Sequence, residues 1–155
     1  MPIETEHKYL VNYELWQQII PNKSVHIKQA YLLTGPNKTI RIRTAGNSGF
    51  LTIKGKTIGA SRPEFEYEIP IEEANQLIES FCSELIEKTR HYVVHENKTW
   101  EVDVFEGMNA GLIVAEIELE DEHEKYIKPN WITQDVTDDR RYANSNLSLN
   151  PFTIR

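Results

Sequence analysis

The chain has 155 residues, 39% of them hydrophobic and 26% charged, with a formal net charge of −7 at pH 7. These values predict one globular domain over residues 1–155, exclude a disordered chain and argue against non-specific nucleic-acid binding. No apolar stretch approaches the ~18 residues of a membrane-spanning helix, and no basic start precedes an apolar run as in a secretion signal. Cys82 is the only cysteine, so we expect no internal disulfide and a cytoplasmic location, without membrane or nucleic-acid partners.

The first predicted strand covers residues 3–11, and charged residues alternate along it. Glu4, Glu6 and Lys8 are two positions apart, so in an extended strand they project from one face. A short helix follows, with Asn12 as its N-cap. Taken alone, such a charged face is more often solvated than functional, because half-exposed antiparallel strands commonly have one polar face.

Seven further strands are predicted from the alternation of apolar and polar residues between turn residues. They cover residues 27–33, 39–44, 50–54, 62–69, 85–94, 99–105 and 112–120. Helical spacing replaces this alternation over residues 71–83, which predicts a helix in the middle of the chain. After Asp121 we expect short helices at 122–127 and 137–142, and then a tail from Asn144 that lacks clear periodicity.

The charges of these strands are segregated by sign. The cationic pairs are Arg41 with Arg43 and Lys88 with Arg90, and the acidic pairs are Glu64 with Glu66 and Glu116 with Glu118. Solvated surfaces mix the two signs within a strand, because like charges two residues apart repel. The segregation therefore favours an α+β fold in which eight antiparallel strands close into a β-barrel, with the charges inside and helices packed on the outside.

A barrel interior with this many charges must pair them, hydrate them or hold a ligand, because unpaired buried charge costs several kcal/mol per ion. Arg and Lys side chains suit phosphate oxygens, and carboxylates suit Mg²⁺ or Mn²⁺, which in turn bridge to phosphate. A metal-bound polyphosphate would satisfy both sets of charges.

An ordered series of short motifs resembles the CYTH superfamily, the triphosphate tunnel metalloenzymes. The first motif, Glu4-Thr5-Glu6-His7-Lys8, is similar to the E-x-E-x-K signature of that family. The later motifs lie at residues 41–43, 52–55, 62–66, 87–90, 101–105, 115–118 and 136–144. One such signature is weakly specific, but the ordered set extends over nearly the whole chain.

The resemblance implies an eight-stranded tunnel that binds a triphosphate and a divalent metal ion, Mg²⁺ or Mn²⁺. It implies metal contacts from Glu4, Glu6, Glu64, Glu66, Asp103, Glu116 and Glu118. It implies phosphate contacts from Lys8, Arg41, Arg43, Lys54, Arg62, Lys88 and Arg90. The implied catalytic residues are Lys8, Tyr31, Glu116 and Glu118, with Tyr31 as a partner of the signature lysine.

The activity implied by the resemblance is metal-dependent hydrolysis of a triphosphate, with inorganic tripolyphosphate as the expected substrate and diphosphate and phosphate as products. Three alternatives stay open: an adenylate cyclase that converts ATP to cyclic AMP and pyrophosphate, a nucleoside or thiamine triphosphatase, and a noncatalytic module that binds polyphosphate or a nucleotide. The sequence does not fix the oligomeric state, and a homodimer is compatible with it.

Overall fold

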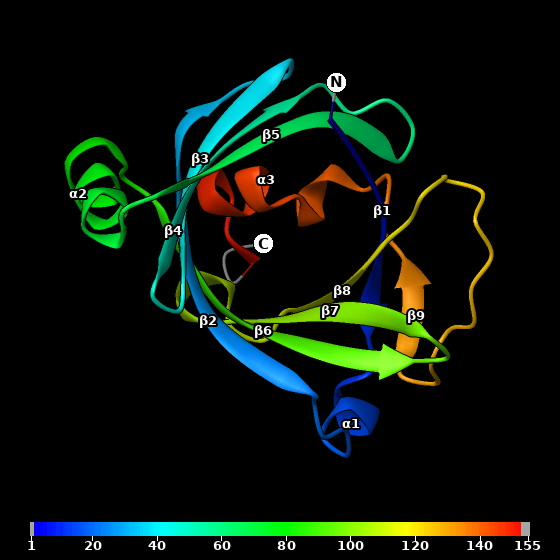
Figure 1. The fold of residues 1–155 in the computed structure, drawn as a ribbon. Helices are drawn as coiled ribbons and strands as arrows, with labels where there is room; N and C mark the ends of the chain where they lie inside the picture. The colour runs from blue at the N-terminus through cyan, green and yellow to red at the C-terminus, as the bar shows by residue number, and fades with distance from the viewer. Residues whose placement is uncertain (1, 153–155) are drawn as a thin grey trace.

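Eight strands form the body of the protein in this computed structural model, which describes residues 2–152 (Figure 1). The strands are β1 (Ile3–Val11), β2 (Lys23–Thr34), β3 (Lys38–Ala45), β4 (Ser48–Gly55), β5 (Ser61–Ile69), β6 (Leu85–His95), β7 (Lys98–Phe105) and β8 (Ile113–Glu118). Each strand was predicted to within a few residues, because alternation between turn residues is a strong local signal. Strands β2 to β5, and likewise β6 to β8, pair antiparallel with their neighbours along the chain.

The first strand closes these two sets of strands into a barrel. β1 pairs antiparallel with β8, where Lys8 lies opposite Glu116, and with β5, where Glu4 lies opposite Arg62. The pairing of β2 with β6 joins the two sets on the other side of the ring. The predicted closed, eight-stranded antiparallel barrel is therefore confirmed.

A ninth strand, β9 (Ile132–Asp135), pairs with the later residues of β1. Tyr9 lies opposite Asp135 and Val11 opposite Ile132, and the register shifts between these two pairs as it does at a β-bulge. The sequence does not predict β9, because four residues are too few to display a period of two.

Two helices pack on the outside of the barrel, as expected (Figure 1). α1 (Tyr13–Trp16) begins after Asn12, whose side-chain oxygen accepts a hydrogen bond from an N–H of the first turn at 2.9 Å, so the predicted N-cap is confirmed. α2 (Ile71–Phe81) lies against β3 and β4, and its Ala74 is fully buried. Gly49 permits this close approach, because a Cβ atom there would lie 2.8 Å from the Cβ of Ala74.

Aromatic side chains cover the outer face of β1, β7 and β8. The rings of Trp16 and Trp131 meet edge to face with centroids 5.3 Å apart, and Trp100 and Trp131 do so at 6.1 Å. All three rings are buried, and such pairs add about 0.5–1.5 kcal/mol beyond the burial of their area. This cluster holds the long connection between β8 and β9 against the barrel wall.

The chain after β8 differs from its prediction. Residues 122–123 form a turn and residues 124–127 have no regular secondary structure in place of the predicted helix. The segment is held against the barrel, where the Tyr126 hydroxyl is hydrogen-bonded to the His7 ring at 2.7 Å. The helix predicted at 137–142 is reduced to one 3-10 turn, η2 (Arg140–Tyr142), since the chain turns again directly after it.

A last helix, α3 (Asn144–Leu149), forms where the sequence predicts a tail, and it lies within the ring of strands (Figure 1). Its Leu147 is completely buried in a cluster with apolar side chains of the barrel. We call this cluster the apolar floor; its members are Ile86, Phe105, Leu112, Val114 and Leu147. A helix of six residues shows no recognisable period, so only the contacts made by its side chains reveal where it belongs.

The short helix η1 (Gly107–Asn109) connects β7 to β8 and holds the last part of the described chain. The buried side chain of Asn109 accepts a hydrogen bond from the Phe152 N–H at 2.8 Å. Within residues 2–152, no helix has both the length and the apolar character needed to span a membrane.

Candidate active site

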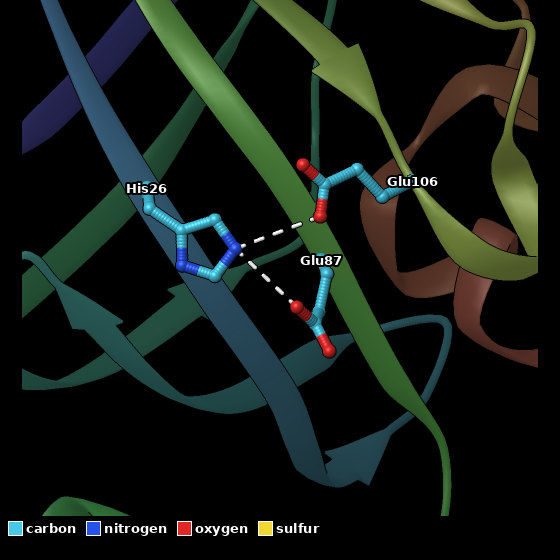
Figure 2. A group of neighbouring side chains, drawn as sticks. All are labelled: His26, Glu87 and Glu106. Atoms are coloured by element: carbon cyan, nitrogen blue, oxygen red, sulfur yellow. Dashed lines mark ion pairs between the residues drawn. The ribbon is translucent and has the colours of Figure 1, made fainter.

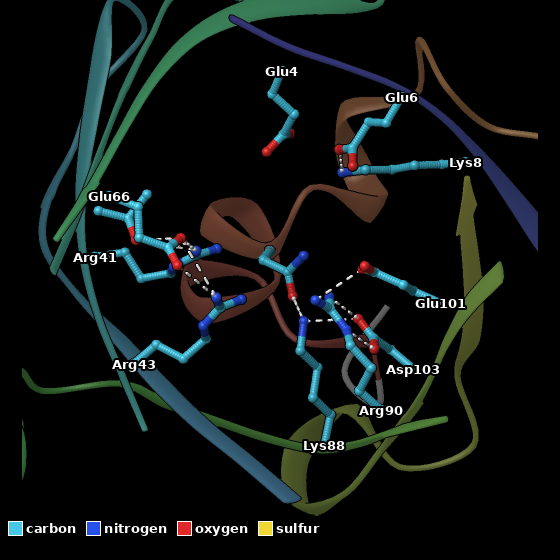
Figure 3. Close-up of polar contacts among 12 residues, drawn as sticks. Glu4, Glu6, Lys8, Arg41, Arg43, Glu66, Lys88, Arg90, Glu101 and Asp103 are labelled. Atoms are coloured by element: carbon cyan, nitrogen blue, oxygen red, sulfur yellow. Dashed lines mark hydrogen bonds and ion pairs between the residues drawn. The ribbon is translucent and has the colours of Figure 1, made fainter. Parts of the chain in front are cut away.

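The same alternation that forms the strands places their charged side chains inside the barrel (Figure 3). The cavity there, which we call the lumen, has a volume of about 210 Å³, the space of roughly seven water molecules. It is lined by every predicted phosphate-binding side chain, namely Lys8, Arg41, Arg43, Lys54, Arg62, Lys88 and Arg90. It is also lined by Tyr31 and by the predicted acidic residues Glu4, Glu6, Glu64, Glu66, Glu116 and Glu118. The structure therefore brings together all of the predicted site residues except Asp103.

Asp103 lies behind this lining, where two cations neutralise it. Its carboxylate accepts hydrogen bonds from the Arg90 guanidinium at 2.8 and 2.9 Å and forms an ion pair with the Lys88 ammonium at 2.8 Å. Burial alone would raise the pKa of Asp103, but attraction to Arg90 and Lys88 outweighs it and lowers that pKa well below its usual range. Asp103 is thus a buried anion whose oxygens already have partners, and it orients the two cations.

Lys88 is fixed from two directions. Its side chain is only 1% exposed, and burial lowers the pKa of Lys88 to about 8, although the charge of Asp103 opposes this shift. The ammonium also donates a hydrogen bond to the side-chain oxygen of Asn144 at 3.0 Å. The first residue of α3 therefore contacts a cation of the lumen directly.

Arg41 and Arg43 form a second cationic group across the lumen from Lys88 and Arg90 (Figure 3). The carboxylate of Glu66 lies 3.8 Å from Arg41 and 3.4 Å from Arg43, and burial together with repulsion by Arg41 lowers the pKa of Arg43 to about 10. Within residues 2–152, the Nε atoms of both arginines are buried and have no hydrogen-bond partner. Because buried donors without partners are costly, these guanidinium groups favour an anion in the lumen.

Glu4 and Glu64 share a hydrogen bond beside Lys54. The Lys54 ammonium lies 3.0 Å from the Glu4 carboxylate. Burial and the hydrogen bond to Glu4 raise the pKa of Glu64 to about 7. Burial would raise the pKa of Glu4 as well, but the hydrogen bond from Glu64 and the charge of Lys54 lower it. The two carboxyl groups therefore share one proton near neutral pH.

Glu6 and Glu116 are neighbours on β1 and β8 and repel each other. Burial, and then the charge of Glu116, raises the pKa of Glu6 well above its usual range. Lys8 lies 3.8 Å from Glu6, and although burial would lower the pKa of Lys8, attraction to both glutamates raises it. Lys8 therefore stays protonated between two carboxyl groups that it does not fully neutralise.

The carboxylates around Glu6 fit a divalent cation by their chemistry. Glu6, Glu116 and Glu118 offer the oxygen ligands that Mg²⁺ and Mn²⁺ prefer, and a cation beside them would relieve the repulsion that raises the pKa of Glu6. In the part of the chain that the structure describes, no three lumen carboxylates have oxygens within 4.8 Å of one another. Ion pairs with Lys and Arg side chains hold several of them, so binding a cation there requires side chains to reorient.

Sequence reasoning missed three residues of the lumen: Tyr92, Glu101 and Asn144. The Glu101 carboxylate lies 3.0 Å from the Arg90 guanidinium. Burial, opposed by Arg90 but reinforced by Glu116, raises the pKa of Glu101 to about 7. Glu101 lies two positions before Asp103 in the same strand and so projects from the same face, and this spacing could have revealed it. Asn144 offered no such signal, because its segment lacks a period.

Tyr31 lines the lumen but lies beside the apolar floor. Among residues 2–152, no hydrogen bond joins Tyr31 to Lys8, its predicted partner. Tyr31 packs instead against the cluster that contains Leu147, and its partner in the β2–β3 register is Arg41. Its catalytic role stays a prediction.

A wider groove of about 780 Å³ lies outside the barrel beside β1. His7, Glu122, Asp135 and Asp138 are among the residues that line it. Its acidic lining is unsuited to a polyphosphate, because like charges repel. The lumen is therefore the better candidate for the active site.

The closed barrel and its lumen define a class of protein: a small β-barrel whose interior pairs carboxylates with Arg and Lys side chains and can accept an anion together with a cation. A model of the CYTH domain family matches residues 2–150, so the chain belongs to that family.

Relatives with established names match the chain over nearly its full length. An inorganic triphosphatase of Acetivibrio thermocellus is 45% identical over 150 residues, which cover 96% of this chain and 95% of the relative. An inorganic triphosphatase of Nitrosomonas europaea is 32% identical over 153 residues, which cover 94% and 97% of the two chains. A crystal structure of an inorganic triphosphatase has a TM-score of 0.66 to this chain at 30% identity, over 96% of each chain. The lumen strands and α3 all lie within residues 2–150, which the family model matches.

Proposed function

We propose that this protein hydrolyses inorganic triphosphate to diphosphate and phosphate with the help of a divalent cation, Mg²⁺ or Mn²⁺. The observation that carries the proposal is the lumen, where Arg41 and Arg43, whose buried Nε atoms have no hydrogen-bond partner in residues 2–152, share one small cavity with carboxylates that repel one another. The two sets suit the phosphate oxygens and the cation of a single ligand. The names of both relatives support this substrate.

The lining of the lumen also favours a bare polyphosphate over a nucleotide. Tyr31 and Tyr92 are the only aromatic residues in its described lining, and nearly all the other side chains are charged. Nucleobases and other organic groups bind in largely apolar pockets with a few polar contacts, which this lining does not offer.

The phosphate chain binds to cations from both sides of the lumen. Arg41 and Arg43, steadied by Glu66, are suited to bidentate contacts with phosphate oxygens on one side. Lys88 and Arg90, steadied by Asp103, act from the other side. Lys8, Lys54 and Arg62 complete the predicted phosphate contacts.

The cation binds to carboxylates that are not committed to arginine. Glu4, Glu6, Glu64, Glu116 and Glu118 are the proposed ligands. The ion pairs of Glu66 and Asp103 favour a different role for these two residues, which is to hold the phosphate-binding cations in place. When bound, the divalent cation supplies Lewis-acid stabilisation of phosphate charge and lowers the pKa of a bound water.

The reaction forms a bond between a water oxygen and the terminal phosphorus and breaks the bridging P–O bond, whose electron pair leaves with diphosphate. Charge that develops on the transferred group and on the leaving diphosphate is stabilised by Arg41, Arg43, Lys88 and Arg90. The proton of the water passes to a lumen carboxylate that does not hold the cation.

An assay of phosphate release tests the proposal. Tripolyphosphate, ATP and thiamine triphosphate are each incubated with Mg²⁺ or Mn²⁺, and cyclic AMP is measured in parallel. We expect tripolyphosphate to have the highest kcat/KM and no cyclic AMP to form. Faster turnover of ATP, or cyclic AMP as the product, would overturn the assignment, and tight binding without turnover with either metal would identify a noncatalytic module.

The variants Glu6→Gln and Glu116→Gln test the role of the carboxylates. We expect each to lower kcat by at least about 10²-fold, because even the partners that orient metal ligands are worth 10–100-fold, while the cations still bind substrate. Glu68→Gln is the matched control, since Glu68 is an exposed residue of β5 outside the lumen lining. Unchanged turnover in both lumen variants would refute the proposed metal contacts.

A further inference from the structure

Three side chains of types that bind metal ions in other proteins, one histidine and two glutamates, meet on the outer face of the barrel, away from the lumen (Figure 2). His26 belongs to β2, Glu87 to β6, and Glu106 directly follows β7. Glu87 precedes Lys88 in its strand, so the alternation that turns Lys88 inward turns Glu87 outward. Among residues 2–152, this is the only group in which three His, Cys, Asp or Glu ligand atoms lie within 4.8 Å of one another.

The three donor atoms are spaced as around a small metal ion. The Nε2 atom of His26 lies 3.3 Å from Oε2 of Glu87 and 3.6 Å from Oε2 of Glu106. A tetrahedral zinc site with bonds of about 2.0–2.1 Å separates its ligand atoms by about 3.3–3.4 Å. Both distances from His26 therefore match a tetrahedral edge closely, without movement of the backbone.

The charge around this group also favours a cation. Two carboxylates converge on one imidazole, and no ion pair joins Glu87 to Lys28, its partner in the β2–β6 register, within the described residues. The side chains are between one-third and one-half exposed, so an ion can enter and keep a water ligand. This group is thus left with more negative charge than its neighbours neutralise.

The backbone beneath the group is rigid. The Glu106 N–H donates a hydrogen bond to the Glu87 carbonyl at 2.9 Å, and His26 and Thr89 are paired across β2 and β6. The Thr89 hydroxyl donates to the Glu106 carboxylate at 3.5 Å, a long contact that favours its present orientation. Ligands held by strands in this way lose little freedom when an ion binds.

We propose that His26, Glu87 and Glu106 form a second metal site that binds Zn²⁺ on the outside of the barrel. An imidazole with two carboxylates suits Zn²⁺ better than Mg²⁺, which prefers oxygen ligands alone, and Zn²⁺ binds such mixed sites more tightly than Mn²⁺. The ion joins β2, β6 and the start of η1. It therefore stabilises the folded barrel, because the unfolded chain does not hold the three ligands together.

The site is tested with the full chain, free of any affinity tag and stripped of metal, in a saturating concentration of Mg²⁺ that occupies oxygen sites of the lumen. Zn²⁺ is then titrated and its heat of binding measured. We expect His26→Gln and Glu106→Gln each to weaken one Zn²⁺ site per chain by at least about tenfold. Zn²⁺ should also raise the unfolding temperature of the unaltered protein by several degrees, and this rise should be absent in both variants.

The matched control is His123→Gln, which removes a surface histidine that faces one carboxylate, Glu122, at 3.5 Å. It should leave Zn²⁺ binding and the rise in unfolding temperature unchanged. Circular dichroism and tripolyphosphate turnover without Zn²⁺ check that the His26 and Glu106 variants fold. Equal Zn²⁺ affinity in the unaltered protein and in His26→Gln, or an equal loss in His123→Gln, would overturn the site. Nitrogen chemical shifts of the His26 ring supply a further readout, because coordination through Nε2 shifts that nitrogen and leaves the His123 ring unaffected.

Discussion

The inside of this barrel contains two regions built from the same strands with the same alternation of side chains. In the charged lumen, β6 and β7 contribute Lys88 and Asp103. Two residues away on each strand, the apolar floor receives Ile86 and Phe105, which pack against Leu147 of α3. The floor is stabilised by burial of apolar area, and the lumen depends on ion pairs whose desolvation cost offsets much of their attraction.

The residues that stabilise the fold and the residues suited to chemistry are therefore only a short distance apart along each strand. An apolar contact gains free energy whether or not a ligand is present. A buried charge in the lumen lowers the stability of the fold unless a partner or a ligand neutralises it. The ligand-free lumen is therefore less stable than an apolar interior would be, and this is the cost of its function. Substitutions in the two regions should therefore have different signatures.

The largest expected effect on stability comes from Asp103→Asn, which breaks the buried contact with Arg90 and Lys88. We expect a loss of about 3–5 kcal/mol in the free energy of unfolding, because the variant removes the buried anion that these two buried cations share. Denaturant unfolding measures it. Added triphosphate should restore part of this loss, since its oxygens neutralise the same cations. A loss below about 1 kcal/mol would contradict the role given to Asp103.

Removal of side-chain volume from the apolar floor should be nearly as destabilising, but added triphosphate should not restore the lost stability. Leu147→Ala should cost about 2–5 kcal/mol, because Leu147 is 0% exposed and its truncation leaves a cavity. Leu149→Ala, in the same helix but 59% exposed, is the matched control and should change the free energy of unfolding by no more than about 0.5 kcal/mol. Triphosphate should not selectively rescue Leu147→Ala. Equal effects of the two variants would mean that α3 does not pack on the floor.

A conservative change in the lumen should alter binding more than stability. Arg43→Lys keeps the positive charge but removes the planar guanidinium that contacts Glu66 and is suited to phosphate. We expect KM for tripolyphosphate to rise roughly tenfold, equivalent to about 1.4 kcal/mol, with a small change in unfolding temperature. Steady-state kinetics measures the change in KM, and thermal unfolding measures the change in unfolding temperature. A large fall in unfolding temperature with unchanged KM would assign Arg43 to the fold.

The smallest expected effect is a pH dependence of stability in metal-free protein. Glu101 has its pKa raised to about 7 in the folded state, so between its usual value and pH 7 the folded state binds more protons than the unfolded state. Its contribution is therefore present at low pH and is lost as the pH rises through about 7. We expect the free energy of unfolding to fall by about 1–2 kcal/mol between pH 5 and pH 7.5. The fall should be shallower in Glu101→Gln, and an identical pH profile in that variant would exclude this carboxyl group as the cause.

Sequence reasoning worked best where a period is sustained. Alternation over eight strands placed Arg41 and Lys88 on inward faces, and the segregation of signs predicted that these faces meet inside a closed barrel. The same alternation gives Glu101 the face of Asp103, so it also points to Glu101 as a residue of the lumen.

What could not be predicted depends on contacts between distant parts of the chain. Glu66 holds Arg41 and Arg43 because the register of β3, β4 and β5 aligns them, and no local pattern specifies that register. The placement of α3 follows from the burial of Leu147, one residue in a segment without a period. β9 is equally short and forms only because β1 offers it an unpaired edge.

The position of β1 in the ring also has a consequence for how the protein folds. Of the eight barrel strands, β1 is synthesised first and closes the barrel, and its Lys8 pairs with Glu116, 108 positions later in the chain. Pairings of such long range must overcome the entropy cost of loop closure before they contribute stability, so they form slowly. Until they form, the unpaired strand edges can associate with other chains. On the ribosome, β2 to β5 can assemble early as hairpins, but the ring stays open until β8 has emerged.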